Sequence, residues 1–216
     1  VPFGDGTAVS VAGDPEAQRS TVSLYVLDAP EPFQTRSHYR NLLTRSLFAS
    51  VVNERFREIT RDPESAITNG GVGWNRFLRG TDIAVASAVV RDHNVTEALA
   101  TLVREIERVD RHGILESELE RARERLLQSI DRSRTNQDSI PSGRLADELV
   151  RHWTEGEAVP GIENEYRLFH NLLPSITVDE VGAVAREFSR TSQRVVLAGL
   201  RTGPDGVLPS GKPVPT

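Results

Sequence analysis

The chain has 216 residues, of which 38% are hydrophobic and 26% are charged, a composition typical of a globular domain that buries a substantial core. It contains no cysteine, which excludes disulfides, thiolate zinc sites, iron–sulfur clusters and cysteine nucleophiles. The net charge of −5 argues against nucleic-acid binding, because the chain has no excess of cations to neutralise phosphates.

The first part of the chain predicts strands on both sides of one long helix. Residues 7–13 and 20–30 have the composition of strands, and the second should be the better protected because alternate residues on one face are valine or leucine. Residues 36–61 carry apolar side chains at helical spacing, and Pro63 should end that helix. The apolar positions are Tyr39, Leu42, Leu43, Leu47, Val51 and Phe56.

Two further strands are predicted over residues 66–78 and 81–92. The second has small apolar residues at both odd and even positions, which favours a strand in the middle of a covered sheet. Thr96 should then cap a helix that carries the apolar residues Leu99, Leu102, Val103 and Ile106.

The second half predicts consecutive helices. Gly113 precedes a helix over residues 116–134, whose charged run we interpret as a solvated face. Further helices follow through residues 145–153 and 160–173, and Thr177 with Glu180 has the spacing of a capping box. A closing strand over residues 194–200 completes the pattern.

This order of elements predicts an α+β fold in which helices cover one face of an antiparallel-rich sheet. We expect a single domain over residues 1–203. Residues 204–216 are rich in glycine and proline and should form a linker or flexible tail. No apolar run approaches the roughly 20 residues that cross a bilayer, so no membrane partner is expected. The chain has no methionine, and we therefore expect it to be a segment of a longer polypeptide.

The stretch RHWTEG, residues 151–156, raises the question of a zinc site. His152 and Glu155 match the first histidine and the glutamate of the H-x-x-E-H motif, in which two histidines bind catalytic zinc and the glutamate activates a water molecule. The position of the second histidine is Gly156, which offers no ligand and should end the helix. We therefore interpret His152 as a residue of the last helical turn, where its charge suits the helix dipole.

No other residue pattern predicts a catalytic, cofactor-binding or metal-binding site. The remaining histidines stand singly, without a second histidine within four residues. They are His38, His93, His112 and His170. Gly70, Gly71 and Gly73 lack the lysine and Ser/Thr of a phosphate loop, which favours a bent strand or hairpin. Bulky Trp74 and Phe77 are expected to pack in a core rather than to line a binding surface.

Several longer stretches, in this order and spacing, resemble the M16 (pitrilysin/insulinase-like) zinc metallopeptidases. They are VVNERFREI (51–59), EALATLVREIERVDRHGILESELERARERLL (97–127) and ELVRHWTEGEAVPGIENEYRLFHNLLPSITVDEVGAVAREF (148–188). RVVLAGL is similar to the closing strand of these domains, and the resemblance covers about residues 7–200. GEAVPGIENEYRL is most similar to the bacterial branch that contains large four-domain zinc proteases.

The resemblance implies a sheet backed by helices, with two such domains in each half-shell and two half-shells around a peptide-cleaving chamber. The family holds zinc with H-x-x-E-H and a downstream glutamate, and no H-x-x-E-H occurs here. C-terminal half-shells often carry an arginine and a tyrosine that reach the substrate, but Thr60 stands at the arginine position and residues 65–67 lack a tyrosine. The resemblance therefore points to the second domain of the N-terminal half, or to a C-terminal domain that has lost these residues.

The implied function is that of a non-catalytic, chamber-forming domain of a zinc endopeptidase, with zinc held by a separate catalytic domain. Expected partners are that catalytic domain and a peptide substrate, and the expected location is the bacterial periplasm or cytoplasm, as a soluble protein. One alternative is a scaffold or partner subunit of an M16-like protein without protease activity. Another is an unrelated α+β ligand-binding module, which the topology would distinguish.

Overall fold

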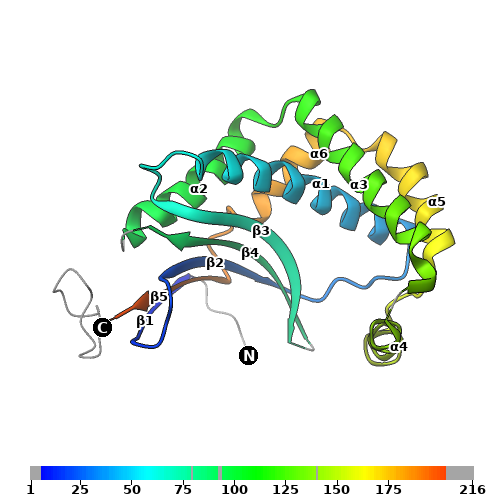
Figure 1. Ribbon diagram of the computed structural model, residues 1–216, viewed down its shortest axis with the longest axis horizontal. Coiled ribbons are helices and arrows are strands. Elements are labelled where there is room, and N and C mark those ends of the chain that lie inside the picture. Colours follow the sequence, from blue (N-terminus) through cyan, green and yellow to red (C-terminus); the bar gives the residue numbers. More distant parts are fainter. Residues whose placement is uncertain (1–5, 79, 92–93, 140, 203–216) are drawn as a thin grey trace. The chain divides into compact units, whose positions relative to one another are not determined.

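A computed structural model describes residues 6–78, 80–91, 94–139 and 141–202, which cluster into two compact units (Figure 1). The first unit comprises Val1–Ala29, Val52–His112 and Ala185–Thr216, and the second comprises Pro30–Val51 and Gly113–Val184. A single domain over residues 1–203 stays a prediction. The expected tail over residues 204–216 lies outside the described residues.

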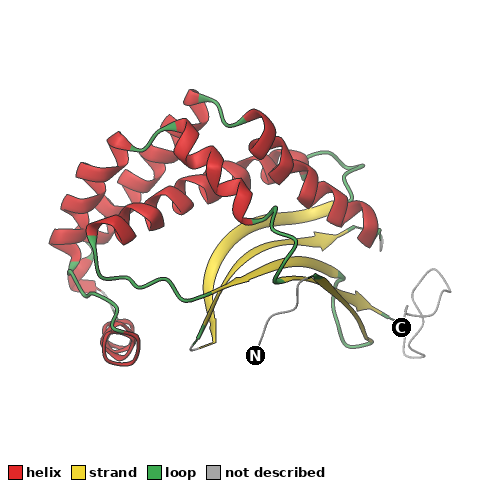
Figure 2. Cartoon of the chain, turned by 180° about the vertical axis from the view of Figure 1, so that it is seen from behind, coloured by secondary structure: helices red, strands yellow, loops and turns green. Residues whose placement is uncertain are grey.

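The first unit is built on a five-stranded sheet with the order β1-β5-β2-β4-β3 (Figure 2). The strands are β1 (Thr7–Asp14), β2 (Thr21–Asp28), β3 (Ile67–Leu78), β4 (Thr81–Val90) and β5 (Arg194–Arg201). β1 and β5 run parallel, whereas the pairs β5–β2, β2–β4 and β4–β3 are antiparallel. The sheet is thus mixed and mostly antiparallel, as expected.

Helix α2 (Val95–His112) packs on the central strands of this sheet. The strand faces beneath it alternate as the sequence predicts: Val22, Leu24 and Val26 of β2 are at most 3% exposed. The neighbouring positions on β4 are alanines, and their small side chains leave room for a helix to lie close to the sheet. The expected α+β class, with helices on one face of an antiparallel-rich sheet, is confirmed.

The start of α2 differs from the prediction. Thr96 lies inside the helix rather than at its cap, because Asn94 takes that place. The Asn94 side-chain oxygen accepts a hydrogen bond from the Glu97 backbone N–H at 3.3 Å, and its carbonyl accepts from Ala98 N–H. Asparagine and threonine are both good capping residues two positions apart, so composition alone did not distinguish them.

Helix α1 (Arg36–Ile59) contributes to both units, since residues 36–51 cluster with the second unit and residues 52–59 with the first. Its predicted buried stripe is confirmed except at Leu42, which is 44% exposed. The buried positions are Tyr39, Leu43, Leu47, Phe48, Val51, Val52 and Phe56. Phe48 and Val52 widen the stripe because a full helix face of a globular protein covers more than one residue per turn.

The second unit is helical. It contains α3 (Glu116–Thr135), α4 (Ser142–Glu155), α5 (Ile162–Leu172) and α6 (Val178–Ala183), and α3 packs against α5. Residues 113–184 contribute aliphatic side chains to its core, each at most 5% exposed, beside the buried residues of α1. They include Leu119, Ala122, Ile130, Leu172, Leu173, Ile176 and Val181.

The predicted capping box at α6 is confirmed and extended by an arginine. Glu180 N–H donates to the Thr177 hydroxyl at 3.3 Å, and Thr177 N–H donates to the Glu180 carboxylate at 2.8 Å. Arg40 of α1 donates to the same carboxylate at 2.8 Å and to the Ser175 carbonyl at 2.9 Å. The Arg40 hydrogen bond first, and then the Thr177 backbone, lower the pKa of Glu180, so this carboxyl stays ionised at neutral pH.

Candidate functional site

His152 lies in the last turn of α4, as the sequence predicts. Gly156 follows with φ 70°, a left-handed conformation that favours glycine, and its N–H donates to the His152 carbonyl. The His152 Nδ1 lies 2.6 Å from the Glu157 carbonyl oxygen, which can only accept, so Nδ1 carries the proton and donates. The ring is therefore held by backbone at the end of its helix.

The other described histidines do not approach His152 to form a metal site. His38 Nδ1 accepts from the Gln34 N–H at 3.3 Å, and His170 Nε2 lies 3.3 Å from an Asp131 carboxylate oxygen. His112 is the last residue of α2, and His93 lies outside the described residues. Among the residues that the structure describes, no group of three His, Asp or Glu side chains could hold a metal ion.

We expect the purified chain to contain well below one zinc atom per molecule after dialysis, measured by atomic absorption or mass spectrometry. The reason is that catalytic zinc needs three protein ligands, and the position that would complete the His152 motif is a glycine. His152→Ala should leave this metal content unchanged. A ratio near one that falls in the His152→Ala variant would contradict the prediction.

The glycine-rich stretch forms the middle of β3, which confirms a strand rather than a phosphate loop. Asn53 of α1 bonds both backbone groups of Val72, accepting from its N–H at 2.7 Å and donating to its carbonyl at 3.3 Å. A Cβ on Gly71 would lie 3.2 Å from the Asn53 side-chain oxygen, so glycine permits this close approach. Because Val72 is bonded in this way, the outer edge of β3 is closed to an added strand at that residue.

Trp74 and Phe77 differ, although both lie on β3. The half-buried Trp74 ring packs edge-on against Phe188, 5.6 Å between centroids, and its N–H donates to the Glu187 carboxylate at 2.9 Å. The packing interpretation is confirmed for Trp74. Phe77 is 60% exposed, so the same interpretation is wrong there, because the strand extends past the part of the sheet that its own unit covers.

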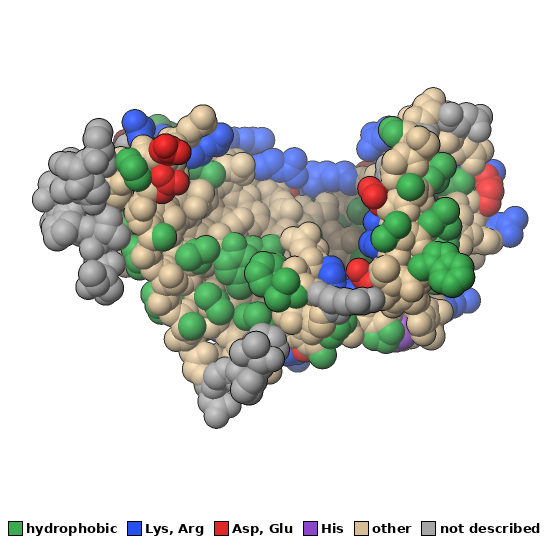
Figure 3. Space-filling model, turned by 90° about the horizontal axis from the view of Figure 1, so that it is seen from below, with side chains coloured by type: hydrophobic (Ala, Val, Ile, Leu, Met, Phe, Trp, Pro, Cys, Tyr) green, Lys and Arg blue, Asp and Glu red, His purple; other side chains and the backbone are tan. Residues whose placement is uncertain are grey.

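The face of the sheet opposite α2 forms a candidate binding surface. Paired residues on β2, β4 and β5 place apolar side chains on it: Tyr25 lies opposite both Val85 and Val195, and Leu27 lies opposite Ile83. Leu197 on the same face is 38% exposed. No helix of the described part of this unit covers this face, and Figure 3 shows hydrophobic side chains gathered there.

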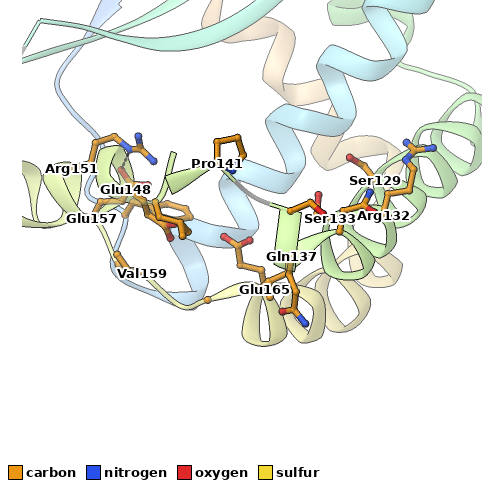
Figure 4. Close-up of a pocket in the computed structure, with 17 residues that line it drawn as sticks. Ser129, Arg132, Ser133, Gln137, Pro141, Glu148, Arg151, Glu157, Val159 and Glu165 are labelled. Carbon is orange, nitrogen blue, oxygen red and sulfur yellow. Dashed lines mark hydrogen bonds and ion pairs between the residues drawn. The ribbon is translucent and has the colours of Figure 1, made fainter. Parts of the chain in front are cut away.

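A cavity of about 900 Å³ lies in the second unit between the end of α3, α4 and α5 (Figure 4). Its lining mixes both signs of charge, with Arg132 of α3, Glu148 and Arg151 of α4, and Glu165 of α5. Arg151 is paired with Glu157 at 2.9 Å. This mixture favours no single class of ligand.

Glu165 also affects a buried tyrosine in the same unit. Tyr39 is 6% exposed and packs against Phe33 and Phe169, with ring centroids 5.2 and 6.1 Å away. Burial first, and then the nearby Glu165 carboxylate, raise the pKa of Tyr39, so the phenol stays protonated under all ordinary conditions. It is a structural residue rather than an acid or base.

The chain is similar in sequence to a curated protein from Arabidopsis thaliana described as zinc protease PQQL-like. The two are 26% identical over 200 residues, which cover 93% of this chain but only 18% of the relative. No protein-family model matches the chain. In the described residues, no helix has both the length and the apolar character needed to cross a membrane.

Solved structures share the fold. The periplasmic protease PqqL from Escherichia coli has a TM-score of 0.84 at 16% identity, covering 93% of this chain and 22% of that protein. The separately solved first half of PqqL gives the same TM-score, and this chain spans 43% of it. A peptidase M16 inactive domain from Pseudomonas fluorescens has a TM-score of 0.62 at 12% identity, over 93% of this chain and 45% of that one.

Proposed function

This chain is an M16-like domain, and from this premise we propose that it is a non-catalytic domain of a zinc endopeptidase that forms part of the wall of a peptide-binding chamber. The observation that carries the proposal is the apolar sheet face opposite α2, on which Tyr25 and Val85 are half-buried and Leu197 is 38% exposed. A partly exposed apolar face of this kind is typical of a binding surface. The alternative of an unrelated ligand-binding module is wrong, because the topology matches M16 domains.

We place the domain in the N-terminal half of its parent protein. Two observations support this position: the similarity to the first half of PqqL, and Thr60 at the position where C-terminal half-shells often carry arginine. The absence of H-x-x-E-H from all 216 residues supports a separate catalytic domain as the holder of zinc. The curated relative comes from a plant, so bacterial origin and a periplasmic or cytoplasmic location stay predictions.

In this proposal the domain binds peptides without chemistry of its own. The apolar face would contact alternate side chains of an extended peptide, and the outer edge of β1 would offer backbone groups for strand addition. The β3 edge is less suitable at Val72, whose backbone groups are bonded to Asn53. Affinity would then depend on backbone geometry and apolar contact, which suits varied peptide sequences.

The test is Leu197→Asp in the full-length parent protein. A carboxylate on the apolar face should raise KM for an unstructured peptide by about tenfold, with kcat little changed, because it weakens substrate and transition state alike. Val9→Asp is the matched control, since Val9 is also exposed but lies on the opposite face, paired with Val196. Both variants should keep the parent's melting temperature.

Two outcomes would contradict the proposal. Equal KM values for Leu197→Asp and Val9→Asp would remove the sheet face from peptide binding. A full-length parent that cleaves no peptide with zinc supplied would favour the scaffold alternative.

A further inference from the structure

Helix α4 is amphipathic with its apolar side outward. Its large apolar residues are 47% (Leu145), 53% (Leu149), 58% (Val150) and 86% (Trp153) exposed. At 100° per residue these positions form one continuous stripe. Figure 1 and Figure 2 both show α4 standing apart from α3 and α5, and the lobe at the right of Figure 3, where α4 lies, carries a cluster of hydrophobic side chains.

The polar side of α4 faces its own unit. Glu148 and Arg151 line the cavity shared with α3 and α5, Leu145 reaches the same cavity from the margin of the stripe, and Glu148 is half-buried. This is the reverse of an ordinary surface helix, which buries its apolar stripe against its own core. In the described part of the unit, Leu149, Val150 and Trp153 of the stripe are therefore not packed into the core.

Hydrogen bonds order the C-terminal end of α4 and tie it to residues 33 and 34. Arg151 pairs with Glu157 at 2.9 Å, and His152 donates to the Glu157 carbonyl. The Gln34 side chain donates to the Gly156 carbonyl at 3.1 Å. The Ala158 N–H also donates to the Phe33 carbonyl at 2.8 Å. Turning the stripe inward would break these two bonds to residues 33 and 34 and would place Glu148 and Arg151 outside, so the outward stripe is a built feature of the fold.

We propose that the stripe of Leu145, Leu149, Val150 and Trp153 is the docking surface for the neighbouring domain of the same polypeptide, which receives the Trp153 ring in an apolar groove. This inference rests on the proposed function, because it needs a parent protein with more than one domain. This chain spans 43% of the first half of PqqL, which leaves room for a second body of similar size in that half.

The size of the stripe favours a tethered neighbour over a second copy of this chain. Four side chains on one helix expose on the order of a few hundred Å², whereas a stable complex of free proteins buries about 800 Å² on each partner. A domain on the same polypeptide has an effective concentration in the millimolar range, so a smaller patch is sufficient. Burial of an exposed tryptophan supplies a large apolar contribution to such a contact.

The test is hydroxyl-radical footprinting, resolved by peptide mass spectrometry, on this chain and on its full-length parent. Each unit of the chain buries its own apolar core, so the chain is a suitable reference. Oxidation of Trp153 should be at least about tenfold slower in the parent, because docking removes an 86% exposed ring from solvent. Trp74, whose indole is bonded to Glu187, should react at the same rate in both and serves as the internal control.

A second measurement uses Trp153→Ala. It should lower the melting temperature of the parent by about 5 °C and leave that of the isolated chain unchanged. Asp147→Ala, on the polar side of the same helix, should change neither. Equal Trp153 oxidation in chain and parent overturns the proposal, and so does protection in the isolated chain that rises with its concentration, which would indicate a second copy.

Peptide cleavage by the parent separates this inference from the proposed function. Cleavage with Trp153 still reactive would overturn the docking surface and keep the chamber role. Protection of Trp153 in a parent without peptidase activity would keep the docking surface and overturn the chamber role.

Discussion

Replacing Arg123 by methionine should destabilise the helical unit by about 3 kcal/mol, a large share of a typical unfolding free energy. The Arg123 side chain is 12% exposed. Its guanidinium donates to the Leu173 carbonyl at 3.0 Å and to the Ile176 carbonyl at 2.9 Å, and it pairs with Glu120. Methionine keeps most of the packing of the aliphatic part of the Arg123 side chain. The lost unfolding free energy therefore comes mainly from the hydrogen bonds and the charge.

The two carbonyls should not contribute equally. Leu173 O also accepts the Ile176 N–H at 3.2 Å, so it keeps a partner in the variant, whereas Ile176 O loses the Arg123 donor. Lysine at position 123 can reach one carbonyl but cannot fork between two, and Arg123→Lys should therefore recover about half of the loss. The measurement is urea unfolding followed by circular dichroism.

Arg121→Met is the matched control, because Arg121 lies on the same helix and is exposed. It should change the unfolding free energy by less than about 0.5 kcal/mol. Equal effects of the two substitutions would mean that the Arg123 bonds contribute nothing beyond helix propensity.

Arg123 also marks a limit of the sequence analysis. The run ESELERARERL reads as a solvated helix face, and for Arg121 that is right. Arg123 lies two residues further along the same run, next to the buried Ala122. Its guanidinium nevertheless donates to backbone carbonyls of residues 173 and 176. The sequence could not predict this, because the two carbonyls come from a segment 50 residues away that no local pattern connects with α3.

Helix α4 shows a related limit. Periodicity predicts the helix, and Gly156 ends it as expected. Periodicity does not say what covers an apolar stripe, so Leu149 and Trp153 have the sequence pattern of core residues although they are exposed. By contrast, strand alternation predicted β2 well, because a sheet face buried within one domain leaves a local period of two in the sequence.

The candidate binding surface was not predicted as a site, since no motif marks it. Tyr25, Val85 and Leu197 come from three strands, and only the pairing of β2 with β4 and β5 brings them to one face. The one sequence feature that relates to this surface is the apolar character of β4 on both of its faces, from which we predicted a strand in the middle of a covered sheet. One of its faces is covered by α2, and the other is the surface proposed here to face a peptide.

Phe56→Ala should destabilise the first unit by about 3–5 kcal/mol, the range for removing a fully buried phenylalanine. Phe56 is 0% exposed and anchors the last turns of α1 to β3. The contact is tight: a Cβ on Gly70 would lie 3.3 Å from the Phe56 ring and 3.1 Å from the Ile67 side chain. The ring therefore lies directly over the strand backbone, and no neighbour can move into the cavity without shifting β3.

Phe77→Ala is the matched control, because it also removes a phenyl ring. Phe77 lies on β3, the strand that Phe56 contacts, but its side chain is 60% exposed. The substitution should cost less than about 0.5 kcal/mol in the isolated chain. Phe56→Leu keeps most of the buried volume and should fall between the two, at about 1.5 kcal/mol. Thermal unfolding of the three variants measures this order. Equal losses for Phe56→Ala and Phe77→Ala would contradict the packing of α1 on β3, on which the position of Asn53 against the strand edge depends.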